Sequence, residues 1–163
     1  MMTEPTEPRE AERALLGART AARLGAVQAL YQMDLVQSDM ADILAEFGST
    51  RLGEDFEDGQ CGRADFPFLS DIVTGVVREQ RRIDPALNAC LAEGWTLARL
   101  DSILRAILRA AAYELVARRD VPARVIINEY MEIAHAFFDE DEPGFVNGVL
   151  DRLARNHRAE EFG

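Results

Sequence analysis

The chain has 163 residues, 48% of them hydrophobic, and a formal net charge of −11. This length and composition are sufficient for one domain or two closely packed lobes, and they exclude wholesale disorder. The acidic balance argues against non-specific binding to nucleic acid, because an acidic surface repels phosphates. No apolar run is as long as a membrane span and no signal peptide is recognisable, so we expect a cytoplasmic protein.

The first part of the chain predicts a polar tail followed by a long helix. Residues 1–12 are rich in Pro, Glu and Thr, and we expect them to be a disordered tail. A helix is predicted through residues 19–36 and a short one over 40–47. Residues 48–63 contain four glycines and many acids and predict a mobile loop, and no role follows for the acidic segment 51–65. The stripe of the long helix that we expect to be buried consists of Leu24, Val27, Leu30, Tyr31 and Leu35.

Two signatures, one Asp-X-Pro and one Asp-Pro, predict helix starts in the middle of the chain. Asp65 precedes Pro67, which predicts a capped helix with proline in its first turn. Asp84-Pro85 repeats the pattern and predicts a helix to about Leu91. The expected apolar face of the first of these helices is Phe68, Leu69, Ile72, Val73, Val76 and Val77.

Three further helices are predicted toward the C-terminus. One spans Asp101 to Ala117, one runs from Pro122 to about Phe138, and the last runs from Pro143 to about Arg155. In no segment do apolar and polar residues alternate with a period of two, the pattern typical of a β-strand. The predicted fold class is therefore all-α, in two small helical bundles joined near residues 80–84. The expected boundaries are a helical domain over 13–156, with lobes 13–81 and 82–156, and a C-terminal tail over 157–163. The core face of the helix from Asp101 is expected to be Leu104, Ile107, Leu108, Ala111 and Leu115.

Several poor helix formers interrupt these patterns. Gly25, Gly75 and Gly148 each cost about 1 kcal/mol relative to alanine in a helix, and close helix approach is the favoured explanation. Asn147 is open to two interpretations, a buried amide that fixes a neighbouring helix end or an amide offered to a ligand. For Glu129, early in its helix, we favour a structural role.

A search for catalytic or metal-binding patterns finds none. The chain has no phosphate-binding glycine loop and no nucleophile elbow. Glu132 and His135 supply a Glu-X-X-His unit only once, whereas a di-iron bundle needs it twice. Cys61 and Cys90 form no CXXC pair, and Cys61 lies among acids that disfavour a thiolate. We therefore predict a binding protein with no enzymatic activity, metal or cofactor.

Three stretches of the chain resemble the NusB family of transcription antitermination factors. They are RTAARLGAVQALYQMDL at 19–35, RAILRAAAYEL at 105–115, and VPARVIINEYMEIAHAFFDEDEPGFVNGVLDRLA at 121–154. The resemblance implies two three-helix bundles with an extra helix. It also implies binding of the boxA element of nascent ribosomal RNA together with the ribosomal protein NusE, assembly with RNA polymerase, and either a monomer or a homodimer.

The resemblance also implies site residues. Arginines that share a helix face can hold successive phosphates, and aromatic and polar groups can contact splayed bases. The residues implied for RNA binding are Arg19, Arg23, Arg124, Phe137, Asp141, Phe145 and Asn147. Tyr31 and Arg105 are implied for NusE, although Tyr31 is equally well explained as a core tyrosine.

The chain departs from the family pattern at three positions. Thr20 and Ala21 stand where well-known members are basic, and Leu104 stands at a usually acidic position linked to NusE. Fewer arginines predict weaker RNA binding with a shallower salt dependence. Two alternatives follow: a scaffold that binds NusE without RNA, and the NusB-like first domain of a ribosomal RNA cytosine methyltransferase.

Overall fold

The computed structural model describes residues 10–36, 39–48 and 65–162, with side chains from residue 17 onward. The expected tail over 1–9, most of the acidic loop 51–65, and Cys61 lie outside the described residues. Every regular element in the described part is helical, which confirms the all-α prediction. The elements are α1 (Glu10–Val36), α2 (Met40–Glu46), α3 (Phe66–Arg78), α4 (Gln80–Asn88), η2 (Leu97–Arg99), α5 (Ser102–Ala117), α6 (Ala123–Phe137), α7 (Glu142–His157) and η3 (Ala159–Glu161).

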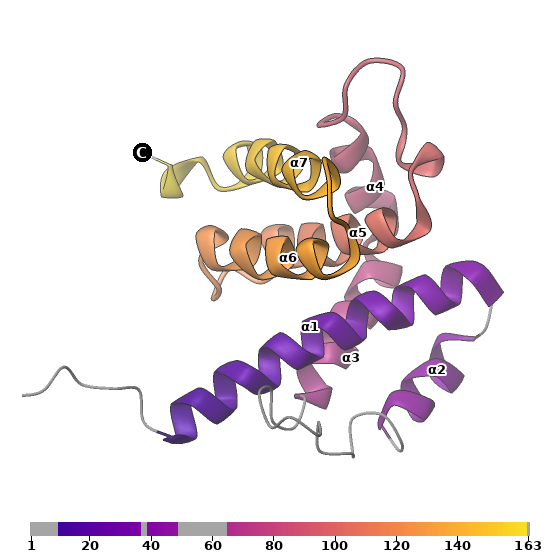
Figure 1. Cartoon of the computed structure of the whole chain (residues 1–163), viewed down its shortest axis with the longest axis vertical. Helices are drawn as coiled ribbons and strands as arrows, with labels where there is room; N and C mark the ends of the chain where they lie inside the picture. Colours follow the sequence, from indigo (N-terminus) through magenta and orange to yellow (C-terminus); the bar gives the residue numbers. More distant parts are fainter. Residues whose placement is uncertain (1–9, 37–38, 49–64, 163) are drawn as a thin grey trace, which may run out of the picture.

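Helix α5 lies at the centre of the fold and contacts α1, α3, α4, α6 and α7. Helix α1 crosses the molecule with α2 and α3 on one side, while α6 and α7 are stacked on the other (Figure 1). The buried apolar side chains form one continuous cluster, which reaches from Val27 of α1 to Leu150 of α7. The two predicted lobes therefore share a core.

The first predicted cap is correct and the second is wrong. The Asp65 carboxylate accepts a hydrogen bond from the Phe68 N–H at 3.0 Å, and Pro67 lies in the first turn of α3. At the second signature, α4 already begins at Gln80, so Pro85 lies inside the helix. Asp84 accepts two hydrogen bonds from Arg109 of α5, at 3.1 and 3.0 Å, and its carboxylate joins two helices instead of capping one.

The chain ends differ from the expected tails. Helix α1 begins at Glu10, so residues 10–12 are helical. At the other end α7 continues to His157, and Arg158 is fully buried. Its guanidinium donates to four carbonyl oxygens at the end of α5 and in the following loop, where the regular i→i−4 hydrogen bonds of the helix end. The accepting carbonyls are those of Glu114, Leu115, Arg118 and Val121.

Close helix packing explains one of the predicted glycines. A Cβ at Gly75 of α3 would lie 2.1 Å from the Tyr113 ring of α5, so these helices approach each other across the glycine. A Cβ at Gly148 of α7 would have no neighbour within 4 Å, so close approach is the wrong explanation there.

We expect alanine to have opposite effects on the free energy of unfolding at Gly75 and at Gly148. Gly75→Ala should lower the free energy of unfolding by about 1–3 kcal/mol, because the Tyr113 ring must move. Gly148→Ala should raise it by about 0.5–1 kcal/mol, because alanine restricts the unfolded chain and nothing obstructs its methyl group. Urea unfolding followed by circular dichroism measures both, and destabilisation by Gly148→Ala would contradict the space found around that residue.

Candidate nucleic-acid and protein interface

Arg23 does not face solvent, which corrects its predicted role as a phosphate ligand. Its side chain is 3% exposed. The guanidinium donates to both oxygens of the fully buried Glu114 carboxylate, at 2.8 and 3.0 Å, and to Glu129 at 3.1 Å. The Tyr130 hydroxyl donates to Glu114 at 2.6 Å. A guanidinium with these partners is not available to RNA in this structure.

This buried network joins three helices and depends on Glu114, which lies on α5 between Tyr113 and Leu115. A buried carboxylate is costly unless it is paired and hydrogen-bonded, and here Arg23 from α1 and Tyr130 from α6 meet that need. Glu129 also accepts a hydrogen bond from the Thr20 hydroxyl at 2.9 Å, which confirms the structural role favoured for it. The sequence signal was a glutamate within the otherwise apolar run of α5.

Arg19 lies one turn before Arg23 and remains partly exposed. Its side chain is 34% exposed, its Nε is 4.0 Å from the Asp65 carboxylate, and its guanidinium lies 4.6 Å from the centre of the Phe68 ring. The Nε donates no hydrogen bond to any described residue. The hydrogen bond from Arg118 lowers the pKa of Asp120, and the positive charge of Arg19 adds to this effect.

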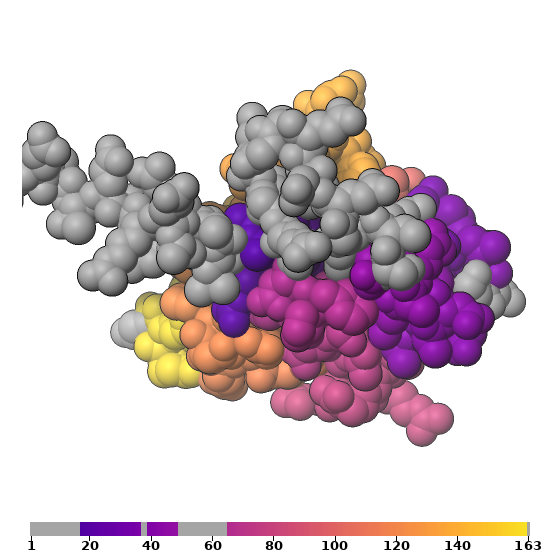
Figure 2. Space-filling view, turned by 90° about the horizontal axis from the view of Figure 1, so that it is seen from below, coloured from indigo at the N-terminus to yellow at the C-terminus, as the bar shows by residue number. Residues whose placement is uncertain are grey.

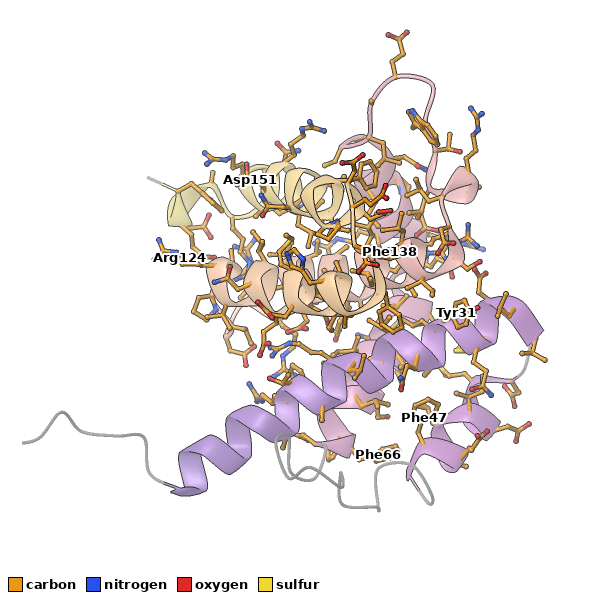
Figure 3. The ribbon with its side chains drawn as sticks, viewed as in Figure 1. Tyr31, Phe47, Phe66, Arg124, Phe138 and Asp151 are labelled. Carbon is orange, nitrogen blue, oxygen red and sulfur yellow. The ribbon has the colours of Figure 1, made fainter. Side chains whose placement is uncertain are left out.

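Arg124 is exposed in the first turn of α6, and no described acidic side chain pairs with it. Arg124 and Phe138 lie at opposite ends of α6 (Figure 3). The fourteen residues from Arg124 to Phe137 span about 20 Å of helix. Arg124 therefore lies at the opposite end of α6 from the predicted residues around the α6–α7 turn.

A groove of about 350 Å³ lies between the second half of α1 and the end of α6. Leu35 is 57% exposed there, so its predicted burial is wrong, and Phe137 is 40% exposed. Tyr31 is half-buried in the groove (Figure 3), so it is neither a simple core residue nor fully exposed. We call this groove 1; it is lined by Val27, Gln28, Tyr31, Gln32, Leu35, Val36, Ile103 and Phe137.

A second groove, of about 450 Å³, lies on the other side of the α6–α7 turn. Trp95 is 52% exposed there, and the Arg99 guanidinium lies 5.5 Å from its ring centre. Adjacent residues of α5, Ile103 and Leu104, line grooves 1 and 2 respectively, so the grooves are neighbours. We call this groove 2; it is lined by Ala92, Trp95, Arg99, Leu100, Asp101, Leu104, Asp141, Glu142 and Phe145.

Asn147 and Arg105 differ in their availability. Asn147 is exposed on α7, so the interpretation as a buried amide is wrong. Arg105, by contrast, donates to the Asp34 carboxylate and to the carbonyls of Leu97, Ala98 and Leu100. It connects η2 and the end of α1 to α5, and its charge is already paired with Asp34.

The described residues contain no group of three or more His, Cys, Asp or Glu side chains placed to hold a metal ion. Within the same part of the chain, none of the helices has both the length and the apolar character needed to cross a membrane.

Removing Arg23 should be far more harmful to folding than removing Arg124. Arg23→Ala leaves Glu114 charged and buried, and we expect a loss of about 3–5 kcal/mol in the free energy of unfolding. Arg124→Ala removes an exposed arginine with no described acidic partner and should change it by less than about 0.5 kcal/mol. Thermal and urea unfolding of both variants test this, and equal stability of the two would contradict the buried network.

Alkaline pH should weaken the same network. Burial, reinforced by the negative charge of Glu114, raises the pKa of Tyr130 well above its ordinary value. Between the unfolded and the folded pKa, the folded state keeps this proton whereas the unfolded chain has released it. The contribution of Tyr130 to the free energy of unfolding is therefore complete below pH ~10 and is lost as the pH rises further. Tyr130→Phe should be less stable than the wild type at neutral pH, and the difference should narrow above pH ~10. A difference that does not change with pH would contradict this assignment.

Comparison with known proteins identifies the family. The NusB family model matches residues 20–155. The NusB transcription antitermination protein of Bradyrhizobium sp. strain BTAi1 is 56% identical over 145 residues, which cover 89% of this chain and 86% of that protein. The NusB protein of Rhodopseudomonas palustris strain TIE-1 is 56% identical over 144 residues, which cover 88% and 83%.

Solved structures agree with the fold. NusB of T. maritima superposes with a TM-score of 0.72 and 32% identity, and the match covers 88% of this chain and 96% of that one. A chain of the crystal structure of antitermination factors NusB and NusE in complex with double-stranded RNA superposes with a TM-score of 0.70 at 22% identity, and the match covers 84% of this chain and 96% of that one. From the family match over most of its length and from relatives at more than half identity, we conclude that this chain belongs to the NusB family of non-enzymatic transcription antitermination factors.

Proposed function

We propose that the protein binds the boxA element of nascent ribosomal RNA together with NusE and couples that RNA to RNA polymerase. The observation that carries the proposal is the pair of grooves on either side of the α6–α7 turn: both contain aromatic rings, and groove 2 adds carboxylates. Family membership supports it, as does the NusB–NusE complex with RNA that shares this fold.

We assign RNA contact to the predicted residues whose side chains reach solvent. Arg19 and Arg124 are the predicted arginines whose side chains reach solvent, and Arg124 has no described acidic partner. The ring of Phe145 in groove 2 provides a stacking surface for an unpaired base. The exposed amide of Asn147, two residues further along α7, offers a donor and an acceptor for a base edge. Asp141 offers acceptors for base amino groups.

We assign NusE contact to groove 1. An exposed apolar patch bordered by polar side chains is typical of a protein-binding surface. Tyr31 joins an apolar ring to a polar hydroxyl, a combination enriched at interfaces, and Leu35, Val36 and Phe137 extend the apolar area around it. Arg105 supports this surface through Asp34 and η2. A homodimer that covers the same surface would compete with NusE.

A second candidate function is a scaffold that binds NusE without RNA. The burial of Arg23 favours it, because α1 then offers fewer cations to phosphates than the sequence suggested. The methyltransferase alternative is not supported, because the relatives that this chain covers at 86% and 83% of their length are antitermination proteins.

RNA binding is tested with boxA and scrambled RNA, each with and without NusE, over a series of salt concentrations. We expect a preference for boxA that increases with NusE. Arg124→Gln should weaken binding and reduce the salt slope by about 0.7, the value for one phosphate contact to a single strand. The control is Arg119→Gln, since the exposed Arg119 already pairs with Glu160 at 2.6 Å and the charge change is equal. Binding of NusE without any preference for boxA would select the scaffold function.

The NusE surface is tested with two exposed apolar residues. Leu35→Ser in groove 1 should weaken NusE binding at least about tenfold, because it removes apolar area at the interface. Val125→Ser on α6, where the side chain is 43% exposed and outside groove 1, should bind NusE like the wild type. Titration calorimetry measures both affinities, and equal losses would contradict the assignment of groove 1.

A further inference from the structure

Three exposed arginines lie within five residues where α3 ends and α4 begins. Arg78 closes α3, and Arg81 and Arg82 belong to the first turn of α4. The side chains of Arg78 and Arg82 are 57% and 61% exposed, and Arg81 is exposed as well. We call these three residues the corner arginines. Figure 2 shows this part of the chain, in magenta to pink, as a ridge at the lower edge of the molecule.

The corner arginines are less neutralised than most described arginines. Arg109 pairs with Asp84 at 3.0 Å and Arg118 with Asp71 at 3.1 Å, and Arg155 and Arg119 also have acidic partners. At the corner, by contrast, Arg78 and Arg82 converge on the single carboxylate of Glu79, at 3.5 and 3.9 Å. No described acid pairs with Arg81.

The other acid at the corner is already engaged. Asp84 accepts two hydrogen bonds from Arg109 and one from the Gln80 amide at 3.3 Å. With Asp84 balanced by Arg109, three arginines face one carboxylate, which leaves a local excess of two positive charges on a protein whose net charge is −11. On such an acidic molecule, a polyanion is attracted only where positive charge is concentrated in this way.

The chemistry of the corner favours phosphodiesters. The sequence contains no lysine, so its strongly basic side chains are all arginines, and the planar guanidinium binds phosphate oxygens through two parallel hydrogen bonds. Beside the arginines lies a hollow of about 540 Å³ lined by Val77, Gln80, Arg81, Asp84 and Pro85. The exposed apolar surface of Val77 and Pro85 offers a non-specific contact for the ribose and base of a single strand.

The corner is separate from the RNA site proposed above. Arg19 lies beside Asp65 and Phe68 at the start of α3, whereas Arg78 lies at its end. The fourteen residues from Asp65 to Arg78 span about 20 Å. A nascent transcript longer than boxA can therefore contact the corner with its flanking nucleotides.

We propose that the corner arginines form a second, sequence-independent surface that binds the phosphate backbone of single-stranded RNA flanking boxA. This inference rests on the proposed RNA-binding function and extends it to a different face of the protein. Binding there adds affinity for a long transcript without reading its bases, because phosphate contacts carry no sequence information.

The test compares two RNAs in the presence of NusE, one limited to boxA and one with the same boxA in a longer unstructured sequence. The variant is Arg78→Gln/Arg81→Gln/Arg82→Gln. The control is Arg119→Gln/Arg152→Gln/Arg155→Gln, which removes the same charge from three exposed arginines that already have described partners. Circular dichroism establishes that both variants are folded.

We expect the corner variant to bind the short RNA like the wild type. It should bind the long RNA at least about tenfold more weakly at low salt, with a salt slope reduced by about 2, as for three phosphate contacts of about 0.7 each. The control should bind the long RNA more tightly than the corner variant. The proposal is overturned if the two variants bind the long RNA equally, or if the corner variant loses NusE while its RNA binding remains. Absence of any boxA preference in the wild type would refute the proposed function, whereas the difference between the variants on long RNA would still decide the role of the corner.

Discussion

The buried carboxylate of Glu114 is the constraint around which the rest of the fold is arranged. It lies on the central helix α5 with no exposure to water, and it is satisfied by Arg23 from α1 and Tyr130 from α6. An ion of this kind contributes little net stability to a fold, but it strongly penalises arrangements in which its partners are absent. The crossing of α1 over α5 and α6 is therefore fixed by charge as well as by apolar packing.

This constraint has a consequence for the surface. Because the Arg23 guanidinium is buried, it cannot contact a ligand at the surface. Helix α1 therefore offers fewer cations to a polyanion than its sequence suggests. Exposed arginines without a described acidic partner lie on other elements, at Arg81 on α4, Arg99 in η2, Arg124 on α6 and Arg152 on α7. The apolar surface that reaches solvent is concentrated at grooves 1 and 2. Groove 2 combines apolar rings with charged side chains, whereas groove 1 has no charged lining residue.

Local signals were sufficient to predict most helices. The core face of α5 and the Asp65 cap were correct, because periodicity and capping depend on residues within a few positions of each other. The failures involved distant partners. Arg23 is buried because it pairs with Glu114, 91 positions away, and Asp84 joins two helices because it pairs with Arg109, 25 positions away. The site was harder still, since Leu35 appeared to continue a buried stripe and only the packing of α5 and α6 shows that nothing covers it.

The burial of Arg158 links the fold to the order in which the chain is made. Four carbonyls at the end of α5 and in the loop after it accept hydrogen bonds from this one side chain, and Glu161 accepts another from the Ala123 N–H at the start of α6. Both residues come after α6 and α7 in the sequence. During synthesis on the ribosome, the α5–α6 junction can thus reach its final hydrogen bonding only after α7 and the turn that follows it have also emerged. The junction between two central helices is completed by residues that are translated after both of them.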